Sequence, residues 1–235
     1  LQHGGPQHTT AISLLGDGFS IWRDYIPDTS AFCRQLFQLS LPALTAVDPK
    51  AIADSVSTDA LQAFVNMSAV DTRLYIEFVN SIIVNAQQTT PATVAAAITS
   101  IYPLAHKYPA ALTDLLVVIT SLLLKVLDLH FPAIRDACLL ASTNILRYFV
   151  ETFPMVTVHN EKQKLAVGNH EGFVVIYDMR TASKWQLFEA HKSSIAGLAF
   201  SPNGEMLVSV APKEQSCRIF KIDGSGVLNL LGVAT

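Results

Sequence analysis

The sequence has few charged residues and no run of one sign. Charged residues make up 15% of its 235 residues, with Lys plus Arg at 16 and Asp plus Glu at 19, which gives a net charge of -3 at pH 7. Because a protein that binds phosphate backbones needs a basic stripe, we expect no nucleic-acid partner. Hydrophobic residues make up 50% of the chain, enough to bury the core of a globular protein.

Cysteine is equally scarce. Cys33, Cys138 and Cys217 are far apart in the sequence and lie among apolar residues. This pattern is typical of reduced, buried thiols, so we expect a cytoplasmic protein. The chain starts at Leu1, without an initiator methionine or a secretory signal, and we therefore expect it to be a piece of a longer, non-secreted protein.

The sequence also lacks a long hydrophobic run. Residues 115–129 form its most apolar stretch, but this stretch contains Lys125 and Asp128. It is also shorter than the ~20 residues that span a bilayer. The stretch is predicted to be a helix buried among other helices. Any membrane association is expected to be peripheral and to depend on partners.

Motifs that carry catalysis, cofactors or metals are missing. No glycine pair is followed by the Lys-Ser/Thr ending of a phosphate-binding loop, and no Gly-x-Ser-x-Gly segment marks a nucleophilic serine. The seven histidines and three cysteines show no spacing of metal ligands. We therefore predict no catalytic, cofactor-binding or metal-binding residues, and a protein that is not an enzyme.

The first part of the chain has helical periodicity. Leu74, Phe78 and Ile82 recur on one face of a predicted helix. A second helix is predicted to begin at Pro132, since a first helical turn tolerates proline. Its apolar face is predicted to contain Ile134, Cys138, Ala141, Ile145 and Phe149. We predict a flexible lead-in over 1–18 and an α-helical repeat region, HEAT/armadillo-like, over 19–153. A compact helical bundle fits the same pattern.

From residue 154 onward the hydrophobic period changes to two. Short runs of β-branched and aromatic residues alternate with turn residues, which predicts strands over 154–235. The predicted strands are 155–159, 164–168, 173–178, 184–189, 195–200, 206–210, 218–222 and 227–233. They form two four-stranded units about 40 residues apart, a spacing typical of propeller blades. The predicted fold class is thus α+β by segment.

Several short motifs of this second part resemble those of the WD-repeat family. In the first predicted blade, Glu171-Gly172 and Tyr177-Asp178 take the places of the family's Asp-Gly and Trp-Asp. In the second, Ala190-His191 takes the place of Gly-His, and residues 200–204 match the turn between the first two strands. Phe220-Lys221 takes the Trp-Asp place of the second blade. The resemblance implies two four-stranded antiparallel WD-type β-propeller blades.

The resemblance also implies structural roles. In the family, a buried His, a Ser and an Asp hydrogen-bond to the Trp inside the sheet, and His191 and Ser209 stand at two of these positions. Phe220 has no indole N–H, so the second unit is expected to lack part of this network. Because an unpaired buried polar group costs about 1–3 kcal/mol, a structural role is favoured for His191 over a catalytic one.

Two blades cannot close a propeller ring, which takes roughly four to eight. We expect the remaining blades to come from the same full-length chain. The layout, together with residues 168–172, 185–186 and 199–202, resembles the C-terminal part of the rabconnectin beta-subunits. This resemblance implies a scaffold that regulates assembly of the vacuolar proton-ATPase and vesicle acidification. The implied partners are a DMX-like rabconnectin alpha-subunit and vacuolar ATPase subunits, on synaptic or endosomal vesicles.

Two other functions fit the same layout. A small-GTPase regulator would act through an inserted arginine or an acidic finger, although each arginine of the helical part is expected on a solvated helix face. A ubiquitin-ligase substrate receptor or a vesicle-coat element also combines a propeller with helical repeats. Since nothing catalytic is found, binding to proteins without turnover is the predicted function.

Overall fold

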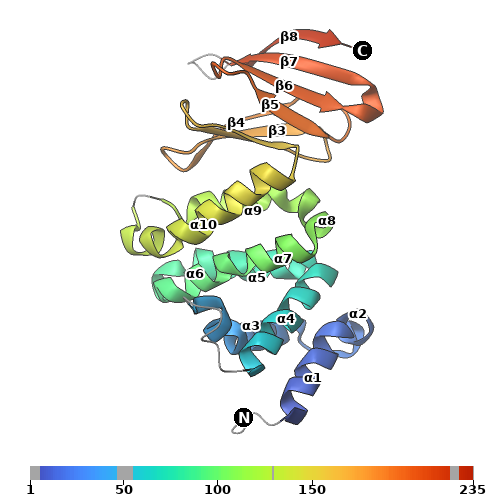
Figure 1. Ribbon diagram of the computed structural model, residues 1–235, viewed down its shortest axis with the longest axis vertical. Helices are drawn as coiled ribbons and strands as arrows, with labels where there is room; N and C mark the ends of the chain where they lie inside the picture. The colour runs from blue at the N-terminus through green and yellow to red at the C-terminus, as the bar shows by residue number, and fades with distance from the viewer. Residues whose placement is uncertain (1–5, 47–54, 129, 223–227, 235) are drawn as a thin grey trace. The chain divides into compact units, whose positions relative to one another are not determined.

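The computed structural model describes residues 6–46, 55–128, 130–222 and 228–234 (Figure 1). Helices come first along the chain, and strands follow. The fold is helix-rich with two antiparallel sheets, which confirms the α+β layout. The chain divides into two compact units. The helical unit is formed by Leu1–Leu112 and Asp136–Ala141, and the sheet unit by Thr113–Arg135 and Ser142–Thr235.

The helical unit begins earlier than the sequence indicates. Helix α1 (Pro6–Asp17) lies within the predicted flexible lead-in. It packs on α4, and a Cβ atom at Gly16 would stand 2.4 Å from the Cα of Ala63, so glycine permits this close approach. The remaining helices are α2 (Phe19–Trp22), α3 (Thr29–Thr45), α4 (Ser55–Val70), α5 (Thr72–Val84), α6 (Pro91–Thr99), α7 (Ile101–Lys107) and α8 (Pro109–Leu112), with 3-10 turns η1 (Arg23–Tyr25) and η3 (Ala86–Gln88).

Side-chain caps set where several of these helices begin. Asp28, Asp71 and Thr90 each accept a hydrogen bond from the backbone N–H three residues later, at 2.8, 2.9 and 3.2 Å. Pro91 follows the Thr90 cap in the first turn, where its missing N–H costs nothing.

Aromatic rings from three helices form the core of the helical unit. The ring centroids of Phe37 and Phe64 are 5.7 Å apart, and Tyr75 lies 5.8 Å from Phe64. The buried face of α5 contains Tyr75, Ile76, Val79 and Ile83. The predicted face at Leu74, Phe78 and Ile82 is half-buried. The helix was predicted correctly, but its buried face is one residue out of phase.

The sheet unit includes helical segments. These are η4 (Thr113–Leu115), α9 (Leu116–Lys125) and most of α10 (Pro132–Thr152), which contributes to both units. Helix α9 is buried at most of its positions, so the apolar stretch forms a buried helix as predicted. The prediction that other helices surround it is wrong, because α9 packs against strands β2 (Lys164–Gly168) and β4 (Ser183–Glu189). None of the helices in the described ranges is long and apolar enough to cross a membrane. The predicted boundary between residues 153 and 154 follows the end of α10, and the compact unit extends across it.

Eight strands form two four-stranded antiparallel sheets, each in sequential order. The first sheet contains β1 (Val156–His159), β2 (Lys164–Gly168), β3 (Phe173–Asp178) and β4 (Ser183–Glu189); the second contains β5 (Gly197–Phe200), β6 (Met206–Ala211), β7 (Ser216–Ile222) and β8 (Leu228–Ala234). All eight predicted strands are present. The predicted start of the last one, Val227, lies outside the described residues.

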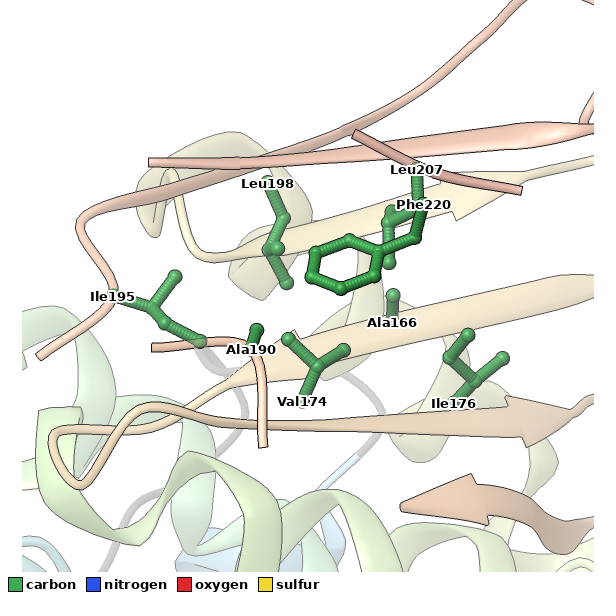
Figure 2. Close-up of a cluster of buried hydrophobic side chains, with 8 residues drawn as sticks. All are labelled: Ala166, Val174, Ile176, Ala190, Ile195, Leu198, Leu207 and Phe220. Carbon is green, nitrogen blue, oxygen red and sulfur yellow. The ribbon is translucent and has the colours of Figure 1, made fainter. Parts of the chain in front are cut away.

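The two sheets pack face to face. Figure 2 shows Leu198, Leu207 and Phe220 of the second sheet directed toward the first sheet. The facing residues of the first sheet are Ala166, Val174 and Ile176, and Ala190 and Ile195 of the connection complete the buried cluster. The rings of Phe188 and Phe220 meet edge-on at 4.9 Å. Burial of these side chains is the main force that holds the sheets together.

Helix α9 lies against the other face of the first sheet. The register pairs Leu165 with Tyr177 and Val167 with Val175, so these four side chains share one face, and each is at most 4% exposed. The Tyr177 hydroxyl lies 3.1 Å from the Val117 carbonyl of α9. With both faces buried, β2 and β3 have continuous apolar runs, whereas β6 alternates between buried and exposed residues.

Candidate functional site

The candidate site is a buried polar network centred on His191, in the connection between β4 and β5. The imidazole is 0% exposed. Its Nε2 lies 2.8 Å from the Ser209 hydroxyl of β6, and its Nδ1 lies 3.1 Å from a carboxylate oxygen of Glu214. Because an ionised carboxylate only accepts hydrogen bonds, Nδ1 donates to Glu214. In a neutral imidazole Nε2 then accepts from the Ser209 hydroxyl. The structure thus brings together the two residues that sequence analysis paired, His191 and Ser209.

Glu214 supplies the acid of this network. It ends the 3-10 turn η5 (Pro212–Glu214) between β6 and β7. Its carboxylate accepts from the backbone N–H of Lys192 and from the Arg218 guanidinium, the latter at 3.3 Å. Desolvation of the carboxylate acts to raise the pKa of Glu214, but the hydrogen bonds from His191 and from the Lys192 N–H outweigh it and lower this pKa.

Arg218 fixes the other side of the connection. Its Nη1 donates to the Ala190 carbonyl at 2.7 Å, immediately before His191. The His191 backbone N–H donates at 3.0 Å to the carbonyl of Gly172, which belongs to the turn between β2 and β3. Gly172 has φ +91°, and a Cβ atom there would stand 2.1 Å from the His191 carbonyl oxygen. The network therefore joins the second sheet, the connection and the first sheet.

The acidic and basic members of this network, Glu214 and Arg218, were not predicted from the sequence. Glu214 and Arg218 lie 23 and 27 residues after His191, and the predicted turn around Glu214 lacks the family's Asp-Gly pair. The sequence pattern that could have indicated them is an acidic residue in this turn, Glu214, four residues before an arginine on the next strand, Arg218. Phe220 makes no polar contact in the network and fills the apolar core between the sheets. Cys217, which was expected to be buried, is half-buried on β7.

Ser209, His191 and Glu214 have the order of contacts found in a nucleophile, base and acid triad. A nucleophilic serine must meet its substrate, but Ser209 and His191 are both 0% exposed. The hydroxyl is enclosed between β6 and the connection, so this arrangement supports packing and not acyl transfer.

The predicted residues of the first sheet lie elsewhere. Tyr177 hydrogen-bonds to α9, and its hydroxyl lies 2.7 Å from the Ser121 hydroxyl. Burial raises the pKa of Tyr177. Asp178 accepts from Lys164 Nζ at 2.9 Å, and this ammonium lies 4.1 Å above the Trp185 ring. Glu171 is exposed in the turn before β3, where its backbone N–H donates to the Asn169 side chain at 3.1 Å. Neither Tyr177 nor Asp178 joins the His191 network.

Hydrogen bonding and desolvation act in opposite directions on Asp178. Desolvation alone would raise its pKa, but hydrogen bonds from Lys164 and Arg180 hold the pKa of this carboxyl well below its usual range. Asp178 therefore stays ionised and anchors the end of β3 to β2.

A second histidine joins the sheets at the opposite ends of their strands. His159 Nε2 lies 2.9 Å from the Pro202 carbonyl in the turn between β5 and β6, and Nδ1 accepts from the Lys162 N–H at 3.1 Å. Gly204, at φ +66°, lies close beneath this ring. His159 and His191 thus fix the stacking of the sheets at both ends.

The helical unit contains a small surface cleft of about 310 Å³. Asn66 lines this cleft. Its side chain donates to Asp17 at 2.6 Å and accepts from Gln62, Lys107 and Tyr108 at 2.7 to 3.0 Å. The polar groups of the cleft therefore bond to one another and hold α1, α4 and the end of α7 together. Within the described ranges, no cluster of three or more His, Cys, Asp or Glu side chains could hold a metal ion.

The comparisons with known proteins give a partial likeness. No family model matches the chain. The chain is similar in structure to the Cps50 (Swd1) beta-propeller domain of Myceliophteria thermophila, with 20% identity and a TM-score of 0.30. The match covers 33% of this chain and 25% of that one, so the chain spans about a quarter of that domain's length.

Proposed function

We propose that this chain is a non-enzymatic protein-interaction scaffold. The observation that carries the proposal is the burial of the Ser209–His191–Glu214 constellation, whose nucleophile and base are both 0% exposed. Polar groups that could do chemistry are used to fix two sheets against each other. A purified sample should therefore hydrolyse a p-nitrophenyl ester no faster than its His191→Gln variant.

The two sheets are proposed to be WD-type blades of an incomplete β-propeller. Their sequential strand order, face-to-face packing and His191–Ser209 link support this interpretation. The remaining blades are proposed to come from the same full-length polypeptide. The helices before them are proposed to form a HEAT/armadillo-like repeat region, which would add a second surface for partners.

The specific role follows from the resemblance to rabconnectin beta-subunits. We propose that the protein regulates assembly of the vacuolar proton-ATPase together with a DMX-like alpha-subunit. It is proposed to be cytoplasmic and to associate with synaptic or endosomal vesicles through these partners.

Affinity purification of the tagged protein at its native length tests this role. Mass spectrometry should find the DMX-like subunit and vacuolar ATPase subunits. Tyr177→Ala, which opens the first sheet, should reduce their recovery, whereas Tyr25→Ala should not, because Tyr25 is 81% exposed. If ubiquitin-ligase adaptors or coat proteins are recovered in their place, the scaffold proposal stands and the rabconnectin role is refuted. A small GTPase whose nucleotide turnover is accelerated would refute the non-enzymatic proposal.

A further inference from the structure

The surface cleft of the helical unit has the size of a small-ligand site. Its volume of about 310 Å³ is at the lower end of the roughly 300–1,000 Å³ of ligand pockets, so it fits a small molecule. Three parts of the chain line it: the end of α1 with Gly16 and Asp17, α4 with Asn66, Ala69 and Val70, and Tyr108 directly after α7.

The side-chain oxygen of Asn66 is approached by more donors than it can satisfy. Three donors, Gln62 Nε2, Lys107 Nζ and the Tyr108 hydroxyl, lie 2.7 to 3.0 Å from it. A carbonyl oxygen has two lone pairs, so the third donor is in excess. An ammonium has three N–H groups, and within the described ranges Lys107 Nζ makes one hydrogen bond, to this oxygen. The cleft therefore has donors to spare for an added anionic oxygen.

Asp17 gives the other end of the cleft the opposite charge. Its carboxylate accepts one hydrogen bond from the described residues, from Asn66 Nδ2 at 2.6 Å. Asp17 is the last residue of α1, and the last turn of this helix contains no basic residue. Because the C-terminal end of a helix carries a partial negative charge, α1 reinforces the charge of the carboxylate. An added ammonium group would be attracted to this end.

The two charges are separated by a single side-chain amide. Asn66 directs its Nδ2 to Asp17 and its Oδ1 to Lys107. A simple anion would be attracted by Lys107 and repelled by Asp17, and a simple cation would meet the reverse. A free α-amino acid carries an ammonium and a carboxylate on one carbon atom, at a separation similar to that of the amide nitrogen and oxygen. This class of ligand matches both ends of the cleft at once.

The apolar part of the lining indicates the side chain of the ligand. Residues three and four positions apart share one face of a helix, so Ala69 and Val70 lie beside Asn66 on α4. Ala69 is half-buried, and Val70 is 42% exposed. An aliphatic side chain placed here would remove this apolar surface from water, whereas a charged one would lose its hydration.

We propose that this cleft binds a free α-amino acid with an aliphatic side chain. The carboxylate of the ligand accepts hydrogen bonds from Lys107 Nζ and the Tyr108 hydroxyl. Its ammonium donates to Asp17, and its side chain lies on Ala69 and Val70. All of these residues belong to the helical unit, so the inference is independent of the proposed blades and of the identity of the protein partners.

Calorimetric titration of the 235-residue chain with L-leucine tests the proposal. L-leucine should bind at one site per chain. Two analogues each lack one of its charges, since 3-methylbutylamine has no carboxylate and 4-methylpentanoate has no ammonium. Each should bind roughly tenfold more weakly or worse, because each loses a charge-assisted hydrogen bond. Glycine, which keeps both charges but has no side chain, should also bind more weakly. Absence of L-leucine binding, or equal affinity for either analogue, would overturn the proposal.

Two variants separate the proposed contacts from a general loss of structure. Lys107→Met should weaken L-leucine binding roughly tenfold or more and should bind 3-methylbutylamine no more weakly than the original chain does. Asp17→Asn should weaken L-leucine binding by a similar factor and should bind 4-methylpentanoate no more weakly. Lys125→Met is the matched control, because Lys125 also ends a helix, α9, and is exposed. If Lys107→Met binds L-leucine as tightly as Lys125→Met does, the cleft is not the site and the proposal is refuted.

Discussion

Replacement of Tyr177 tests whether α9 belongs to the same packed unit as the first sheet. Tyr177→Phe removes the hydroxyl that bonds to the Val117 carbonyl and the Ser121 hydroxyl. The Ser121 hydroxyl still donates to the Val117 carbonyl at 2.9 Å, so neither group loses all its partners. The free energy of unfolding should therefore fall by about 1 kcal/mol, the net value of a single hydrogen bond.

Tyr177→Ala removes the ring as well. The side chain is 2% exposed, and deletion of a buried aromatic ring costs about 3–5 kcal/mol. With a urea dependence of about 1–3 kcal/mol per M, Tyr177→Phe should lower the unfolding midpoint by roughly 0.3–1 M, and Tyr177→Ala by several times more.

Fluorescence of Trp185 measures this effect. Trp185 lies on β4 of the first sheet, and Trp22 lies in the helical unit, so a Trp22→Phe background leaves a reporter of the sheet unit alone. Tyr25→Ala is the matched control, because Tyr25 is 81% exposed and its loss should change stability by no more than about 0.5 kcal/mol. If Tyr177→Ala shifts the midpoint no more than Tyr25→Ala does, α9 does not cover the first sheet.

Two further predictions concern the His191 network. The folded-state pKa of Glu214 is lowered, so its stabilising contribution is complete above the ordinary value of about 4.3 and disappears as the pH falls through the folded-state pKa. Glu214→Gln should therefore destabilise the sheet unit at neutral pH, and urea titrations should show this deficit shrinking below about pH 4.3; a constant deficit would contradict the carboxylate's role. Gly172→Ala should cost about 1–2 kcal/mol for the left-handed backbone, and more because the His191 carbonyl must move. Ala182→Gly, at a φ of +50°, is the control and should not destabilise the protein in the same urea assay; equal effects would exclude strain at Gly172.

The local pattern of residues is enough to predict most elements of this fold. Hydrophobic period separates helices from strands because a helix and a strand each repeat their buried face at a fixed interval. Thr90-Pro91 and Pro132 mark helix starts. Proline lacks a backbone N–H, and in the first turn of a helix that N–H would have no partner within the helix. His191 and Ser209 could be paired from motifs, since each lies at a fixed place relative to a strand.

What the tertiary structure alone decided is how these elements meet. Hydrophobic periodicity predicts α5 but puts its buried face one residue away from Tyr75, because two adjacent faces of this helix are both apolar. Glu214 reaches His191, and Arg218 reaches the Ala190 carbonyl, only because β6 and β7 pair and return the chain to the connection. Likewise, the continuous apolar runs of β2 and β3 require that both faces of the first sheet be covered, but they do not specify by what. That a helix covers one of them follows from contacts between residues some sixty positions apart, such as Val117 and Tyr177, and no local pattern encodes such a contact.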